Sequence, residues 1–187
     1  MRKTWIAAAC VVALAGMMPA AAEAQAFITP FAGMPSGGDA PKSKITTGVS
    51  LAFMGDVAGF EVDLGYTPDF FAEQPGVALV ADSNVTTLMG NLLLGVGEGK
   101  VRPYVVGGLG LVRSRIELGD LFTNVNTNEW GVTAGGGVTG TLSERVGLRG
   151  DVRYIRGLQD PDNDNDLDVT IGQFDFWRAT AGVVFKF

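Results

Sequence analysis

The sequence predicts an all-β fold, an eight-stranded antiparallel up-and-down β-barrel that spans a membrane. Three observations lead to this prediction. An export segment occupies the N-terminus. Runs in which apolar residues alternate with polar or small residues fill much of the remaining chain. The connections between these runs are alternately short and long, which is typical of a membrane barrel with turns on one side and loops on the other.

The N-terminal segment has the composition of a signal peptide. It begins with Arg2 and Lys3, continues through a mostly apolar stretch at residues 6–18, and ends at Pro19. A membrane-anchoring helix is the alternative, but spanning a bilayer takes about 20 apolar residues and this run is shorter.

Small residues after the apolar stretch offer two cleavage sites of the small-x-small type, one after Ala24 and one after Ala26. We therefore expect residues 1–26 to be a cleaved signal peptide and residues 27–187 to form one outer-membrane barrel domain. Cys10 is the single cysteine, so cleavage would leave a mature protein without a thiol or a disulfide.

Composition excludes several classes of function. The chain has no histidine, which removes the commonest general base and metal ligand. The formal charge is −6 and the pI is about 4.6, so we expect no nucleic-acid partner, because no basic stripe is present to neutralise phosphates. Glycine accounts for 27 of 187 residues without a collagen-like period, and many glycines lie inside apolar runs.

Five runs have a clear period of two and are predicted to be strands. In the run at 59–67, for example, Phe60, Val62 and Leu64 share one face, and Glu61 and Asp63 lie on the other. The same pattern of one apolar face and one polar or small face marks all five, at residues 44–53, 59–67, 130–138, 146–154 and 177–187.

Three further strands are less regular. Residues 27–33 contain Pro30, which a sheet tolerates only near a strand end or at an edge. Residues 84–94 and 101–112 are apolar on both faces, so the sequence leaves open which face of each points inward. The total is eight strands, an even number.

The connections fall into two groups. The short ones are predicted to be periplasmic turns and the long ones extracellular loops. The short connections are residues 54–56, 95–100 and 140–144, and the long ones are residues 34–43, 68–83, 113–128 and 157–172.

Charged residues on the polar faces of the strands indicate that these faces point into the lumen and the apolar faces point outward. Three acids and three bases, which could not share the dry core of a soluble protein without a large desolvation cost, can balance one another in a lumen. These residues are Glu61, Asp63, Arg149, Asp151, Arg153 and Arg178. Aromatic residues at strand ends on the apolar faces suit two interfacial girdles: Tyr66, Trp130, Tyr154, Trp177, Phe185 and Phe187. A soluble β-sandwich with these charges solvated on one face is the alternative.

The chain resembles the small eight-stranded outer-membrane barrels of the OmpA/OmpX-like type over its whole mature length. Residues 180–187 resemble the C-terminal assembly signal of that family, residues 102–110 its fifth strand and residues 89–94 its fourth. The resemblance implies that Gly182, Phe185 and Phe187 form the signal that the barrel-assembly machinery reads.

An acidic run in the predicted fourth loop is a weak candidate for calcium, because acids at every second position supply oxygen ligands. Its members are Asp160, Asp162, Asp164, Asp166 and Asp168. An EF-hand starting at Asp162 fails, since Leu167 and Gln173 stand where glycine and glutamate are needed. A solvated acidic loop is the simpler interpretation, and no cofactor is expected.

Apolar residues also occur in the predicted second and third loops. They either pack over the barrel mouth or form a surface that binds a partner. They are Phe70, Phe71, Val77, Leu79, Val80, Leu118, Leu121 and Phe122.

We expect a non-enzymatic protein of the outer membrane with a structural or surface-interaction role, namely envelope integrity, adhesion or binding through its loops. Eight strands enclose a lumen that side chains fill, so a general porin is not expected. The expected partners are outer-membrane lipid and lipopolysaccharide, the assembly machinery, and an extracellular ligand. The alternatives are a soluble, lipocalin-like, ligand-binding barrel of the periplasm, and a narrow outer-membrane channel or enzyme.

Overall fold

The computed structural model describes residues 25–38, 44–70, 80–97, 99–118, 124–158 and 175–187. Eight strands occupy this part of the chain: β1 (Gln25–Ser36), β2 (Thr46–Met54), β3 (Ala58–Pro68), β4 (Val80–Gly95), β5 (Val101–Leu118), β6 (Asn124–Thr141), β7 (Val146–Leu158) and β8 (Asp175–Lys186). Among the described residues no helix is long and apolar enough to cross a membrane.

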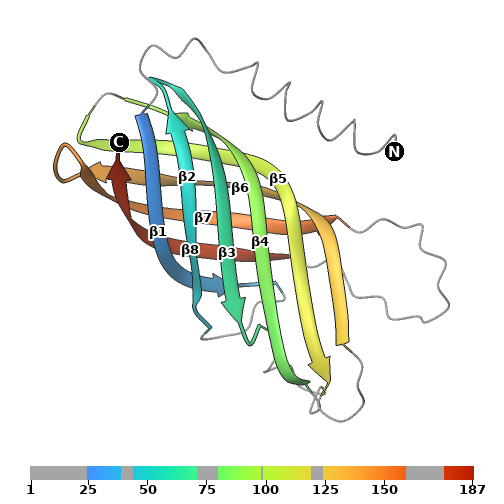
Figure 1. Ribbon diagram of the computed structural model, residues 1–187. Helices are drawn as coiled ribbons and strands as arrows, with labels where there is room; N and C mark the ends of the chain where they lie inside the picture. The colour runs from blue at the N-terminus through green and yellow to red at the C-terminus, as the bar shows by residue number, and fades with distance from the viewer. Residues whose placement is uncertain (1–24, 39–43, 71–79, 98, 119–123, 159–174) are drawn as a thin grey trace.

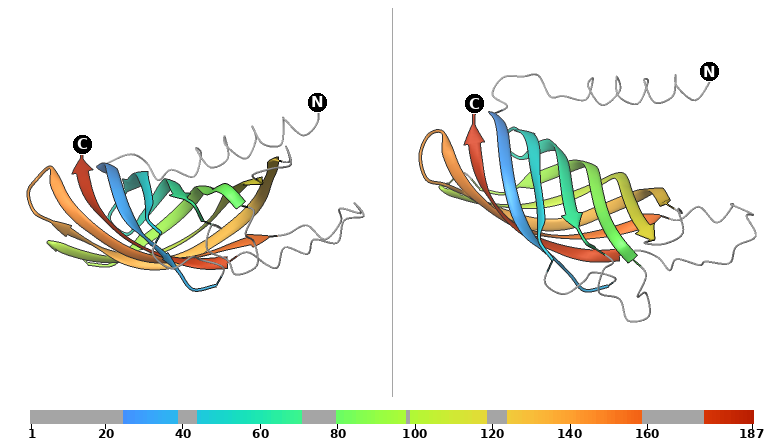
Figure 2. Two further views of the ribbon diagram at one scale, coloured as in Figure 1. Left: turned by 90° about the horizontal axis from the view of Figure 1, so that it is seen from below. Right: turned by 60° about the horizontal axis from the view of Figure 1, so that its bottom comes forward.

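The strands form a closed barrel in which each strand pairs with its neighbours in sequence and β1 pairs with β8. All eight pairings are antiparallel. Figures 1 and 2 show the tilted strands wrapping around one lumen, with β8 beside β1 at the point of closure. The predicted fold class, an eight-stranded antiparallel up-and-down barrel, is therefore confirmed.

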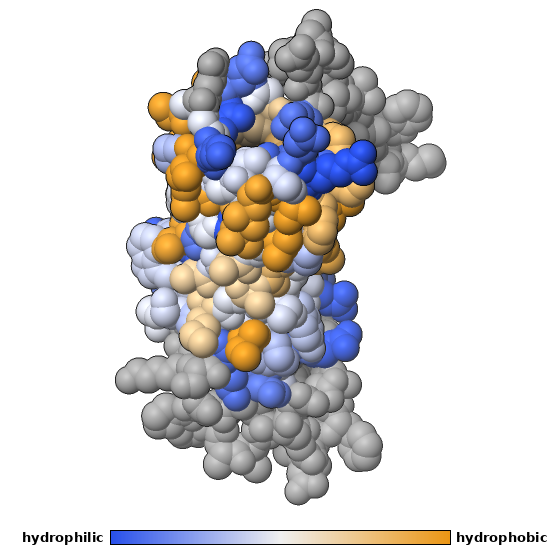
Figure 3. Space-filling view, turned by 90° about the vertical axis from the view of Figure 1, so that its left-hand side faces the viewer, coloured by the Kyte–Doolittle hydropathy of each residue, from blue (hydrophilic) through white to orange (hydrophobic). Residues whose placement is uncertain are grey.

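The outer surface of the barrel is apolar in the middle. Outward side chains of every second residue are exposed, as in Leu51 on β2, Leu92 on β4 and Leu109 on β5. Figure 3 shows hydrophobic residues across the middle of one face, with hydrophilic residues beyond them at both ends. This arrangement is the reverse of a soluble barrel, whose apolar side chains point inward.

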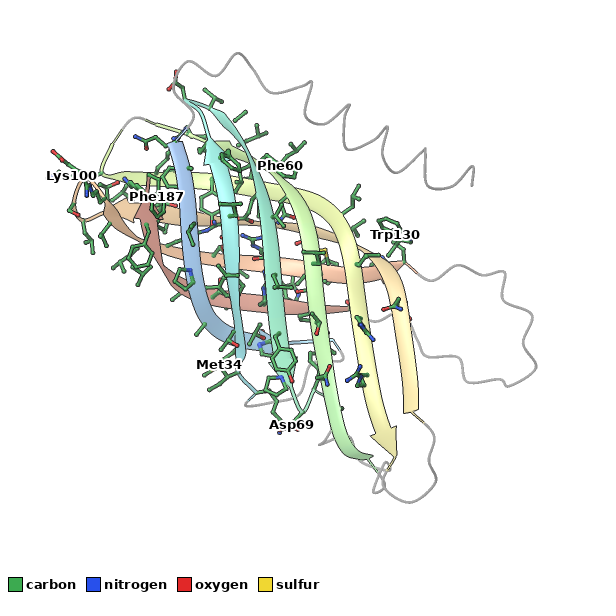
Figure 4. The ribbon with its side chains drawn as sticks, in the orientation of Figure 1. Met34, Phe60, Asp69, Lys100, Trp130 and Phe187 are labelled. Atoms are coloured by element: carbon green, nitrogen blue, oxygen red, sulfur yellow. The ribbon has the colours of Figure 1, made fainter. Side chains whose placement is uncertain are left out.

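Exposed aromatic side chains lie on both margins of the apolar surface. Trp130, Trp177 and Tyr66 are exposed toward the loop end, and Phe185 and Phe187 are exposed toward the turn end. Figure 4 shows Phe187 and Lys100 at the turn end and Trp130, Met34 and Asp69 toward the loop end. These margins match the aromatic girdles that flank a bilayer core.

Strands β4, β5 and β6 are longer than the sequence pattern predicts. Residues 113–128, predicted to be a long loop, are mostly strand, because β5 and β6 stay paired as far as Glu117 and Asn124. The start of β4 likewise includes residues 80–83. The strands continue here without an apolar outward stripe: the outward residue of β5 changes from Leu111 to Arg113, so the pattern that marked the strand ends before the strand does.

Pro30 lies in the middle of β1, where the sequence analysis allowed it only near a strand end or an edge. It pairs with Val49 of β2, whereas the paired positions of β1 and β8 pass from Ile28 to Phe31. The barrel accommodates the missing N–H because Thr29 and Pro30 are not paired with β8, although the register is the same on both sides of them.

Burial settles which faces of β4 and β5 point inward. On β4 the buried positions are the odd-numbered residues from Ser83 to Leu93, and on β5 Tyr104, Val106 and Val112 are buried. Because these inward residues include apolar ones, the two strands look apolar on both faces in the sequence. The lumen therefore has apolar layers as well as a charged one.

Candidate functional site

The centre of the lumen holds all six charged residues that the sequence analysis assigned to it. Glu61 and Asp63 come from β3, Arg149, Asp151 and Arg153 from β7, and Arg178 from β8. Alternation along each strand points them inward, and each is at most 9% exposed. We call these six residues the charge network.

Asp151 lies at the middle of the network and accepts bonds from both neighbouring arginines. Arg153 donates through Nε to Asp151 Oδ1 at 3.1 Å and through a terminal nitrogen to Oδ2 at 3.0 Å, which is a two-point guanidinium–carboxylate pair. Arg149 Nε lies 3.1 Å from Oδ2. The hydroxyls of Tyr104 and Thr180 also donate to this carboxylate, at 2.9 and 3.0 Å.

Glu61 joins the same two arginines from the opposite wall of the barrel. Its carboxylate pairs with Arg149, and its Oε1 lies 2.8 Å from an Arg153 terminal nitrogen. Asn91 of β4 donates to Oε1 at 3.1 Å. Arg149 Nε also donates to the Tyr104 hydroxyl at 2.7 Å, and its guanidinium lies over the Tyr104 ring.

A second pair lies nearer the loop end. Arg178 donates to Asp63 Oδ1 at 2.7 Å, and its guanidinium lies over the Phe31 ring, with 5.1 Å to the ring centroid. Gly65 makes room for this side chain, since a Cβ there would lie 2.5 Å from a terminal nitrogen of Arg178. The network thus has three acids and three bases, and each charge faces an opposite one within 4 Å.

An apolar layer lies between the network and the loop end. Its six side chains are each at most 1% exposed: Phe70, Val85, Met89, Val112, Ile155 and Phe176. The rings of Phe70 and Phe176 meet edge to face, with centroids 5.4 Å apart. We call this cluster the loop-end layer.

Phe70 was predicted either to pack over the barrel mouth or to form a binding surface, and the structure buries it inside the barrel. Of the other apolar loop residues in that prediction, Val80 and Leu118 lie within strands. The remaining ones, Phe71, Val77, Leu79, Leu121 and Phe122, fall outside the described residues. The sequence analysis did not identify Phe176 and Ile155 as lumen residues. Each lies two positions from an inward arginine, Arg178 or Arg153, so strand alternation points both of them inward as well.

A second apolar cluster lies between the network and the turn end, and it borders a cavity. Ala52, Leu93, Tyr104 and Val106 form it, with Phe27 and Met54 packed against it. The cavity measures about 350 Å³ and reaches from Arg149 to the turns, where Asp56, Gly97 and Gly99 line it. We call this space the turn-end cavity.

These layers obstruct the lumen. The space left inside the network measures about 10 Å³, enough for about one water molecule. An ion crossing the barrel would have to separate salt bridges and also pass the loop-end layer. In the described part of the chain, the geometry therefore favours a closed lumen over a continuous aqueous path.

The residues of the resembled assembly signal lie on both faces of β8. Gly182 faces the lumen, and a Cβ there would lie 2.7 Å from the backbone oxygen of Pro30. Phe185 and Phe187 face outward, and Phe187 is 76% exposed. Close packing against β1 is therefore enough to explain a glycine at position 182. The exposed ring of Phe187, in contrast, is accessible to a partner.

The weak calcium candidate at Asp160, Asp162, Asp164, Asp166 and Asp168 lies outside the described residues. Within the part of the chain that the structure describes, no group of three or more acidic residues is arranged to hold a metal ion. The calcium site stays a prediction of the sequence.

Comparison with known proteins gives a family and several similar structures. The model of the family described as "Outer membrane protein beta-barrel domain" matches residues 6–187. The N-terminal β-barrel domain of Pseudomonas aeruginosa OprF is 19% identical, with a TM-score of 0.59, over 88% of this chain and 100% of that one. No curated protein matches the sequence.

Two other solved structures are similar to about the same degree. Neisserial surface protein A is 18% identical, with a TM-score of 0.60, over 88% of this chain and 96% of that one. The attachment invasion locus protein Ail of Yersinia pestis, solved with the heparin analogue sucrose octasulfate, is 13% identical, with a TM-score of 0.56, over 88% and 99% of the two chains. At these identities the likeness concerns the fold.

Proposed function

The chain belongs to the outer membrane protein β-barrel domain family and lies in the outer membrane, and we propose that it is a closed barrel that acts through its extracellular surface. In this proposal its role is envelope integrity through contact with lipopolysaccharide. The soluble periplasmic alternative does not hold, because the charged faces line the lumen and the apolar faces are exposed.

The observation that carries the proposal is the sharp change of outward residues across β4, β5 and β6. Leu88, Leu111 and Trp130 are paired in one row across the three strands. The next outward row toward the loops holds Thr86, Arg113 and Asn128, and Arg115 follows one step further.

Both Arg113 and Arg115 are exposed. We call Arg113 and Arg115 the basic rim.

The basic rim suits the phosphates of lipopolysaccharide. Arg113 stands one outward row beyond Trp130, which marks the edge of the apolar band. Lipopolysaccharide carries its phosphates where acyl chains give way to sugars, so they would lie at the level of the rim. A guanidinium can bind phosphate through two parallel N–H bonds.

Binding of lipopolysaccharide to purified, reconstituted protein tests the proposal. We expect the double variant Arg113→Gln/Arg115→Gln to bind about tenfold more weakly, because charge-assisted hydrogen bonds are lost. Arg145→Gln is the matched control, since Arg145 is an exposed arginine next to the turn at the other end. Equal affinity in the double variant and the wild type would overturn the proposal.

Adhesion to an anionic polysaccharide is a second candidate, favoured by the same rim. Ail, a barrel of similar fold, is described in complex with sucrose octasulfate. If adhesion is the role, sucrose octasulfate should compete with lipopolysaccharide for this protein, and the double variant should lose both ligands. Failure of sucrose octasulfate to compete would leave the lipopolysaccharide proposal alone.

The proposal is non-enzymatic and includes assembly through the last strand. The chain has no histidine to activate a serine or a water molecule. Phe185 and Phe187 present exposed rings on the outward face of β8, where we propose that the barrel-assembly machinery pairs with them. Replacing both with alanine should lower outer-membrane levels in cells, and unchanged levels would contradict this part.

A further inference from the structure

The turn-end cavity has the size and lining of a ligand site. Binding sites for small molecules usually occupy about 300–1,000 Å³ and combine an apolar wall with a few convergent polar groups. The cavity measures about 350 Å³, and its apolar wall comes from four strands: Phe27 of β1, Ala52 and Met54 of β2, Leu93 of β4 and Val184 of β8.

The charged groups that line the cavity are mainly cationic. Arg102, Arg149 and Lys186 line it, against the single described acid Asp56. Arg149 is engaged by the charge network, so Arg102 and Lys186 supply the uncompensated charge. Neither of these two forms a salt bridge with a described residue: Arg102 donates to the backbone oxygens of the Gly55–Asp56 turn, and Lys186 Nζ donates to Thr141 Oγ1 at 2.8 Å.

Three residues of the cavity lining also carry buried polar atoms. Arg149 is 9% exposed, and one of its terminal nitrogens, Nη2, has no hydrogen-bond partner among the described residues. Thr29 is 2% exposed and its hydroxyl is likewise unpaired, as is Arg102 Nε. All three residues line the cavity, but these particular atoms are buried, so the cationic lining by Arg102 and Lys186 is the feature that favours an anion.

We infer that the turn-end cavity binds a small organic anion from the periplasm, with a carboxylate or phosphate group and a short apolar part. The anionic group lies beside Arg102 and Lys186, and the apolar part lies against Met54 and Leu93. This binding is separate from the extracellular function, because the charge network and the loop-end layer lie between the cavity and the basic rim.

Methionine labelling offers a direct test of this inference, because three methionines follow the predicted signal peptide and report on three places. Met54 lines the cavity, Met89 lies in the loop-end layer, and Met34 is 59% exposed on the outer surface. Protein with ¹³C-labelled methionine methyl groups is reconstituted in phosphatidylcholine nanodiscs and titrated with octanoate or phenyl phosphate.

We expect a saturable shift of the Met54 signal, half complete at a concentration on the order of 1 mM, and no saturable shift of Met89. Octanol, which lacks the charge, should bind more weakly. A shift of Met34 in parallel with Met54 would mean partition into the bilayer and would overturn the inference, as would the absence of a saturable Met54 shift.

Two variants test separately how the charge and the volume of the cavity contribute to binding. Lys186→Gln should weaken binding about tenfold by removing a charged donor, and Ala52→Leu should also weaken binding by occupying part of the cavity. Lys100→Gln is the matched control, since Lys100 is exposed at the same end but does not line the cavity.

Unboiled gel mobility verifies folding of each variant, and Arg102→Gln replaces Lys186→Gln if the latter does not assemble. Unchanged binding in both Ala52→Leu and the lysine or arginine variant would overturn the inference.

Discussion

The two ends of the lumen are built differently although the same eight strands form both. Toward the loops, two phenylalanine rings and four aliphatic or thioether side chains are each at most 1% exposed. Toward the turns, the apolar side chains are 4–7% exposed and border a cavity of about 350 Å³. The difference comes from residue volume: Phe70 and Phe176 fill the first end, whereas Ala52 leaves space in the second. Among the described residues, the lumen is therefore more completely filled toward the loop end than toward the turn end.

The largest effect is expected at the charge network, which separates the two ends. Glu61→Gln removes one of the two carboxylates that Arg149 and Arg153 share and should lower the free energy of unfolding by about 3–5 kcal/mol. Denaturant titration of liposome-reconstituted protein measures it. Glu144→Gln, at an exposed turn position, should change stability by no more than about 0.5 kcal/mol. A loss under about 1 kcal/mol for Glu61→Gln would contradict the claim that the ion pairs between β3 and β7 stabilise the barrel.

The same substitution at the two ends tests the comparison itself. Phe70→Ala should lower the free energy of unfolding by about 3–5 kcal/mol, because it opens a void in a filled layer. Phe27→Ala should cost less, about 1–2 kcal/mol, since Phe27 is partly buried and already borders the cavity. Equal losses in the two variants, measured by the same titration, would contradict the proposed difference in packing.

Adding volume should also cost more stability at the loop end than at the turn end. Val112→Phe overpacks the loop-end layer and should destabilise the barrel by about 1–3 kcal/mol. Ala52→Leu extends into the turn-end cavity and should change stability by less than about 1 kcal/mol. If Ala52→Leu is the more damaging of the two, the cavity is smaller in solution than in the structure.

A small effect is also expected on β8, at its seam with β1. Gly182→Ala should lower stability by about 1 kcal/mol even in detergent without assembly machinery, because the added Cβ meets the backbone at Pro30. Phe187→Ala should fold normally in detergent and accumulate poorly in the outer membrane of cells. If Gly182→Ala is as stable as the wild type in detergent, the glycine is not needed for packing, and its role would be recognition by the assembly machinery.

The sequence predicted most of the fold because the outward apolar stripe and the inward polar residues follow a period of two. It predicted the strand ends poorly, since β5 continues through Arg113 and Arg115 after the apolar stripe stops at Leu111. The six charges of the network could be chosen from the strand faces, but their partners could not, because pairing depends on the tilt and register that bring β3 opposite β7.

The period of two that predicted the strands did not predict the loop-end layer or the turn-end cavity. Inward Met89 and outward Leu88 look alike in a strand that is apolar on both faces. A cavity is a difference between the space enclosed by the strands and the volume of the side chains, and no local pattern records that difference.

Single-channel recording in a planar bilayer tests the central claim, that the lumen is closed, most directly. Purified wild-type protein is inserted under voltage beside a 16-stranded porin as a positive control. We predict that the wild-type barrel gives no stepwise conductance above the leak of the bilayer, because the charge network leaves space for about one water molecule. Reproducible openings of uniform size from the wild-type protein would contradict the claim and assign a channel function to the lumen.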